Sequence, residues 1–224
     1  MTPVAHKVMG KVMGKVMDTA APHESRSESL RGHLRAATMA AHDLLDHAMQ
    51  AASGWQNRAD YAHFLALQHA ARASLEDWLA AHAAADLVPP LQTPLLAQDL
   101  AALGMHVPAS SPPFPSRQTP FQTGPGEALG AAWVLAGSAL GNKAIAKQVA
   151  RIGGGEWPTA FLGDGAMMGF WQGLRVRIER PATPAEAEGA TRAAEAVFAH
   201  FLAVADPAPD HALTAEKDAD GWKA

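Results

Sequence analysis

The chain has 224 residues, 48% of them hydrophobic, and a formal net charge of −4 with neutral histidines. This small negative charge excludes a nucleic-acid partner held by phosphate contacts. The absence of Cys excludes disulfides, thiolate catalysis and thiolate metal sites. No stretch reaches the roughly 18 apolar residues of a membrane span, so the sequence predicts no membrane association and a cytoplasmic protein.

The first 27 residues predict a tail rather than part of a fold. They combine a repeated Lys-Val-Met unit with a Ser/Arg/Glu run, a composition that buries little apolar surface. Residues 28–206 are rich in Ala and contain no β-branched run of strand length, which predicts one all-α domain. Residues 207–224 follow as a polar C-terminal tail.

Apolar residues recur at spacings of three and four through most of this domain, which is typical of amphipathic helices. A cluster of Pro, Ser, Gln and Thr over residues 105–125 predicts a long loop. Pro and Gly mark most of the helix ends. The predicted helices run from Ser29 to near Gly54, from Asn57–Asp60 to before Pro89, from about Pro94 to Leu103, from about Gly126 to Ile152, from about Pro158 to Glu179, and from Thr183 to about Val204.

The first helix carries an arrangement that suits an iron porphyrin. His42 stands one turn before Asp46, so the carboxylate can accept a hydrogen bond from the ring nitrogen that does not face a metal. Arg35 lies two turns before His42 on the same side, where its guanidinium could meet a carboxylate such as a propionate. The alternative is a solvent-facing His–Asp pair, which is common on helix surfaces.

Glycines in the predicted helix 126–152 need a compensating reason, because each costs about 1 kcal/mol relative to Ala. Gly137 and Gly141 are spaced by four and leave bare backbone on one face, which a flat ligand could approach closely. Close helix packing is the alternative, because Gly126 and Gly130 have the same spacing.

The remaining candidate groups are less specific. Arg175 and Arg177 lie near a helix end, where cations interact favourably with the helix dipole. The other helical histidines lack a carboxylate or second His at a metal-binding spacing, so we interpret them as surface or packing residues; these are His63, His69, His82 and His200.

Three segments together resemble the biliverdin-producing haem oxygenase family, in particular the bacterial branch found beside bacteriophytochromes. Residues 34–46 resemble the family's first helix, in which a Leu-basic-x-x-Thr stretch precedes the proximal His. Residues 61–68 are similar to its second helix, and residues 133–142 to its distal helix. The bacterial distal pattern, roughly Tyr-Val-Leu-Glu-Gly-Ser-x-x-Gly-Gly, is matched here at Gly137, Ser138 and Gly141. Trp133 stands for Tyr, Ala136 for Glu and Asn142 for the last Gly.

The resemblance implies a helical bundle with haem b held between the first, proximal helix and the glycine-containing distal helix. It makes His42 the iron ligand, with Asp46 behind it, and places Arg35, Arg175 and Arg177 toward the propionates. Gly137, Ser138 and Gly141 would form the distal, catalytic side, where we expect water held by groups such as Ser138 to supply protons.

The implied reaction converts haem to biliverdin, CO and Fe2+ with O2 and an external electron donor. A ferredoxin, a flavodoxin or a reductase would be the redox partner, and a bacteriophytochrome pathway could use the product. Two alternatives stay open, because Trp133 and Asn142 depart from the family pattern: a non-catalytic haem-binding or sensor protein with the same fold, and a cofactor-free helical interaction domain. Haem titration, followed by addition of a donor and O2, separates these possibilities.

Overall fold

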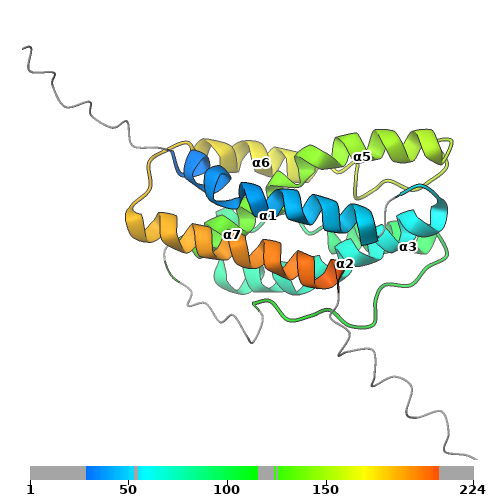
Figure 1. The fold of residues 1–224 in the computed structure, drawn as a ribbon, viewed down its shortest axis with the longest axis horizontal. Helices are drawn as coiled ribbons and strands as arrows, with labels where there is room; N and C mark the ends of the chain where they lie inside the picture. Colours follow the sequence, from blue (N-terminus) through cyan, green and yellow to red (C-terminus); the bar gives the residue numbers. More distant parts are fainter. Residues whose placement is uncertain (1–28, 53–54, 116–123, 125, 207–224) are drawn as a thin grey trace, which may run out of the picture.

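The computed structural model describes residues 29–52, 55–115, 124 and 126–206, and within them every regular element is helical (Figure 1). The all-α prediction is therefore confirmed. The predicted tails, 1–27 and 207–224, and most of 116–125 lie outside the described residues. The elements are α1 (Leu30–Ala52), α2 (Arg58–His82), a short 3-10 helix η1 (Ala85–Leu87), α3 (Thr93–Ala102), α4 (Glu127–Gly137), α5 (Ala139–Ile152), α6 (Gly165–Ile178) and α7 (Pro184–Ala205).

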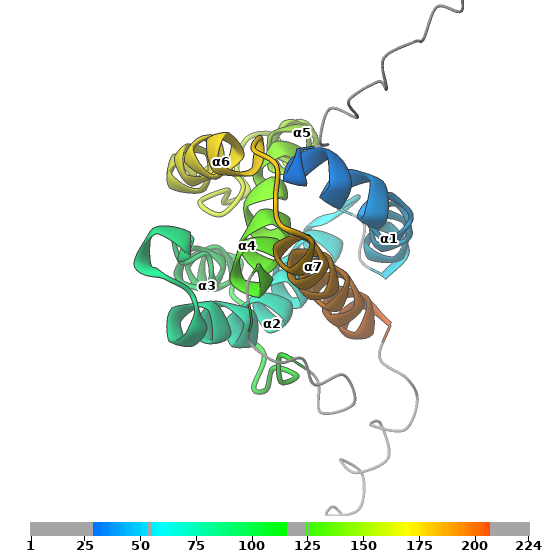
Figure 2. The same ribbon diagram turned by 90° about the vertical axis from the view of Figure 1, so that its left-hand side faces the viewer.

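The helix α4 lies inside the bundle and contacts α7, α6 and α2 (Figure 2). Four of its seven buried residues are Gly or Ala, which allows neighbouring helices to approach closely. A Cβ added at Gly126 would lie 2.1 Å from the carbonyl oxygen of Glu186, and one at Gly130 would lie 2.0 Å from that of Ala190. Close packing against α7 therefore explains both of these glycines.

The helix α1 has α7 along one side and α5 and α6 along the other (Figures 1 and 2). Leu30 and Leu34 bury against the core around α4 and α7, and Met49 joins a second cluster formed with α2, α3 and α5. The helix therefore spans both apolar clusters, while its outward residues remain exposed. No helix in the described residues is long and apolar enough to cross a membrane.

Several predicted helix starts agree with the structure. Asn57 caps α2 by accepting hydrogen bonds from the backbone N–H groups of residues 59 and 60. Thr183 caps α7, with Pro184 in its first turn, as the Thr-Pro pair predicts. The helix α3 begins and ends within one residue of its predicted bounds.

The predicted helix over residues 126–152 is wrong in one respect, because Ser138 divides it into α4 and α5. The Ser138 hydroxyl donates to the carbonyl oxygen of Leu135 at 2.7 Å, a local bond that competes with the helical pattern and bends helices. The flanking Gly137 also weakens the helix at this point.

The predicted start near Pro158 is also wrong, because α6 begins at Gly165. The preceding segment is fixed in a turn by Asp99 of α3, whose carboxylate accepts hydrogen bonds from the backbone N–H groups of Ala160 and Phe161, both at 2.9 Å. Asp164 then accepts from the N–H groups of Ala166 and Met167 and caps the helix. A distant carboxylate thus decides where this helix starts.

We predict that Asp164→Ala lowers the free energy of unfolding at pH 7 by about 1 kcal/mol, the usual cost of losing an N-cap. Burial would raise the pKa of Asp164, but hydrogen bonds from Gln92 and the two N–H groups outweigh it and hold this pKa below its ordinary value. A depressed folded-state pKa stabilises the protein above the ordinary pKa of Asp, and this stabilisation is lost as the pH falls through the folded value. Urea unfolding at pH 7 and in acid checks this, because the difference between the wild type and Asp164→Ala should shrink as the pH falls below about 4. A difference that stays constant would contradict it.

Candidate functional site

Two histidines lie on opposite flanks of α1. His33 lies 3.1 Å from the Thr191 hydroxyl of α7. His42 follows nine residues later, which at about 100° per residue places it roughly 180° round the helix. The His42 ring nevertheless also contacts α7, through Phe198.

The His42 ring has one nitrogen beside carboxylates and the other free. Its Nδ1 atom lies 3.4 Å from an oxygen of Asp46 and 3.8 Å from one of Asp43. Its ring edge meets the buried Phe198 ring, with 6.1 Å between centroids. The side chain is 59% exposed, and no described group hydrogen-bonds to Nε2. Such an imidazole is held in place by its neighbours and keeps a lone pair for a ligand on the exposed side.

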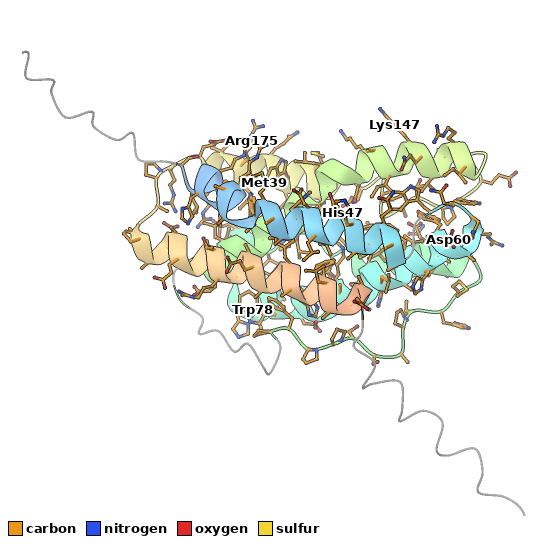
Figure 3. All side chains as sticks on the ribbon, viewed as in Figure 1. Met39, His47, Asp60, Trp78, Lys147 and Arg175 are labelled. Atoms are coloured by element: carbon orange, nitrogen blue, oxygen red, sulfur yellow. The ribbon has the colours of Figure 1, made fainter. Side chains whose placement is uncertain are left out.

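Two further side chains lie on this flank of α1. Arg35, seven residues before His42, is exposed, and within the described residues it forms no ion pair or side-chain hydrogen bond. Met39 stands between them and is 58% exposed, although it is a large apolar residue. Figure 3 shows Met39 and His47 along α1, with Arg175 on α6 and Lys147 on α5.

The side of α5 that carries Gly141 faces the connection between α1 and α2. Gln148 lies seven residues after Gly141, on the same side of the helix, and accepts a hydrogen bond from Trp55 Nε1 at 2.7 Å, just beyond the end of α1. Lys143 and Ala146 point about 140° to 160° away from Gly141. They help to line a cavity of about 430 Å3 between α5 and α6. The described cavity thus lies on the far side of α5 from Gly141.

The glycines at the α4–α5 junction differ from those that pack against α7. A Cβ added at Gly141 would meet nothing within 4 Å, and one at Gly137 would make only an ordinary contact, 3.7 Å from Trp171. Leu140, beside Gly141, is 55% exposed. Helix packing explains Gly126 and Gly130, but it leaves Gly137 and Gly141 without a reason.

Ser138 points into the bundle rather than into open space. Its hydroxyl donates to the Leu135 carbonyl oxygen and accepts a hydrogen bond from Arg72 Nη2 at 2.9 Å. Arg72 is not among the functional residues predicted from the sequence. The available signal was its position on the apolar face of the second helix, where Gln68 stands one turn before it and Leu75 three residues after it.

The two arginines of α6 are used differently. Arg177 forms an ion pair with Asp86 of η1. Arg175 is exposed and forms no ion pair within the described residues, so its guanidinium is available to an added anion. Of the other histidines, His82 and His200 bond to carbonyl oxygens of Trp78 and Ala71. The described residues hold no group of three or more metal-binding side chains.

These residues fit an iron porphyrin in three ways. The imidazole has a free Nε2, Gly141 on the neighbouring α5 leaves space that a side chain would fill, and Arg35 and Arg175 are exposed cations without ion pairs in the described part of the chain. A fourth requirement, a free hydroxyl on the distal side, is not met by Ser138, because its proton is already donated. A scan against models of protein families finds no match for this chain, and no curated protein matches it.

Proposed function

We propose that this protein binds haem b between α1 and α5 and acts as a haem oxygenase. One observation carries the proposal: α1 and α5 lie side by side, with an exposed imidazole at His42 and open backbone at Gly141 (Figures 1 and 2). No buried hydrogen bond holds the His42 ring, and no packing contact requires a glycine at position 141. A flat ligand between the two helices accounts for both.

On the proximal side, His42 would ligate the iron through Nε2. Asp46 beside Nδ1 favours the tautomer with its proton on that atom, which leaves the Nε2 lone pair for the metal. An imidazole is a weaker electron donor to the iron than a thiolate.

At the edge of the ligand, Arg35 and Arg175 would bind the propionates. Both are exposed and free of ion pairs within the described residues, so binding a carboxylate would break no existing pair. Arg177 would contribute only by giving up its pair with Asp86. Charge-assisted hydrogen bonds of this kind orient a planar ligand as well as hold it.

On the distal side, Gly137 and Gly141 would allow the backbone of the α4–α5 junction to approach the ligand closely. When bound, haem would be both cofactor and substrate, with O2 and an external donor (a ferredoxin, a flavodoxin or a reductase) opening the ring to biliverdin, CO and Fe2+. A cytoplasmic location and use of the product in a bacteriophytochrome pathway belong to the same proposal.

One observation favours a second candidate, a haem-binding protein without turnover. The Ser138 hydroxyl hydrogen is already bonded to the Leu135 carbonyl oxygen, so this group has no free proton to deliver toward α1. A haem oxygenase of this sequence would need another distal proton source.

The decisive experiment is a haem titration of the full chain, followed by addition of an electron donor and O2. We expect a one-to-one complex with a histidine-ligated spectrum, and then decay of the haem band as biliverdin absorption rises. A stable haem band with the donor present would favour the non-catalytic binder. An absence of saturable binding would reject both and leave a cofactor-free helical domain.

A further inference from the structure

A buried arginine, Arg72, lies beneath the α4–α5 junction and bonds to Ser138. Arg72 is 1% exposed, and its guanidinium carbon lies over two rings, 5.1 Å from the Phe161 centroid and 5.7 Å from that of Phe201. Burial lowers the pKa of Arg72 to about 10, with the charge of Glu76 acting in the opposite direction. The group therefore remains a cation at neutral pH.

The hydrogen bonds of this cation are incomplete. Nε donates to Gln68 at 3.2 Å and Nη2 donates to Ser138 at 2.9 Å, but Nη1 is buried without a partner. Within the described residues, no carboxylate forms an ion pair with it. The oxygens of Glu76, one turn later, accept instead from Gln92 N, Thr93 N and the Thr93 hydroxyl.

Burying this cation lowers the stability of the fold, which is unfavourable unless the charge serves a function. Removing a cation from water costs several kcal/mol, and neutral partners recover only part of this. An apolar side chain of similar size would fill the space between two phenyl rings without that cost. A third donor without a partner thus indicates that the charge acts on something in addition to Ser138.

The hydrogen bond between Arg72 and Ser138 indicates where this charge acts. Ser138 is the residue at which α4 and α5 meet, and it lies between Gly137 and Gly141, beside which there is open space. A cation held at this junction acts through a poorly screened interior on the open space beside Gly141.

We propose that Arg72 is a positioning residue for the distal side, where its charge, rather than the Ser138 hydroxyl, orients a polar solvent molecule. This inference rests on the proposed haem site. It replaces the expectation that Ser138 itself orients the distal water. Arg72 fixes the hydroxyl of Ser138, and both N–H groups of Nη1 are left without a partner in the described residues.

The test is a pH titration of the ferric haem complex of the full chain. The spectrum changes between an acid and an alkaline form when a proton leaves the distal side, and a nearby cation favours the deprotonated form. We therefore expect Arg72→Met to raise the pH of this transition by about one unit. Arg72→Lys, which keeps the charge, should restore most of the difference.

Two controls separate this role from a general effect of charge or folding. Arg151→Met removes an exposed cation from the last turn of α5 and should leave the transition unchanged. If Arg72→Met gives no haem complex, Arg72→Gln replaces it, because glutamine is neutral but can still hydrogen-bond to Ser138; the same upward shift is expected.

The outcomes of this experiment are distinct from those of the haem titration. Equal transition pH values in the Arg72→Met (or Arg72→Gln) and Arg151→Met complexes would overturn the role of Arg72 and leave the haem site standing. Failure of the wild-type chain to bind haem would instead remove the proposed function, and with it this inference.

Discussion

Replacing His42 with Ala should abolish the histidine-ligated spectrum of the haem complex and weaken haem binding at least about tenfold, the usual scale for losing a metal-site group. The effect should be confined to haem binding, because His42 makes no buried hydrogen bond and its ring is largely exposed. The free energy of unfolding of the ligand-free protein should therefore change by less than about 0.5 kcal/mol. Absorption spectroscopy of the reconstituted variant and urea unfolding of the ligand-free form measure the two quantities.

The matched control is His47→Ala on the same helix. His47 is also exposed, and its Nδ1 atom lies 2.6 Å from the Asp43 carbonyl oxygen. It stands five residues after His42, about 140° round the helix, so it lies outside the flank that carries His42. Its replacement should leave the spectrum unchanged. An unaltered histidine-ligated spectrum in His42→Ala would refute the proximal assignment, whichever residue then proved to be the ligand.

The helices themselves could be predicted because their signals are local. The Thr-Pro start of α7, the Asn57 cap of α2 and the three-to-four spacing along α1 each depend on a few neighbouring residues. The pairing of His42 with Asp46 could be predicted for the same reason, because the two residues are one helical turn apart and lie 3.4 Å from each other.

The features that sequence reasoning missed depend on contacts between distant residues. The late start of α6 follows from Asp99, which lies about 60 positions earlier in the chain and holds the turn before it. The break at Ser138 is stabilised by Arg72 of α2. Periodicity places Arg72 on the apolar face of its helix, but only the packed structure shows which hydroxyl it meets and which N–H it leaves over.

The two pairs of glycines, which look alike in the sequence, should respond in opposite ways to the same substitution. Gly130→Ala would place a methyl group 2.0 Å from the Ala190 carbonyl oxygen and 2.7 Å from its carbonyl carbon, which are backbone atoms of a buried helix. The helices α4 and α7 would have to move apart through a closely packed interior. We expect a loss of about 3 kcal/mol or more in the free energy of unfolding.

Gly141→Ala should instead leave the fold intact and raise the free energy of unfolding by about 1 kcal/mol, because the added Cβ meets nothing within 4 Å and Ala favours the helix. Gly141→Ala should, however, lower the affinity for haem. Gly141→Leu should lower this affinity further, because the larger side chain fills the same space. Urea unfolding and haem titration of the three variants measure both effects. Haem affinity that is unchanged in Gly141→Leu would show that the open space beside α5 is ordinary surface, because a ligand between α1 and α5 must meet that side chain.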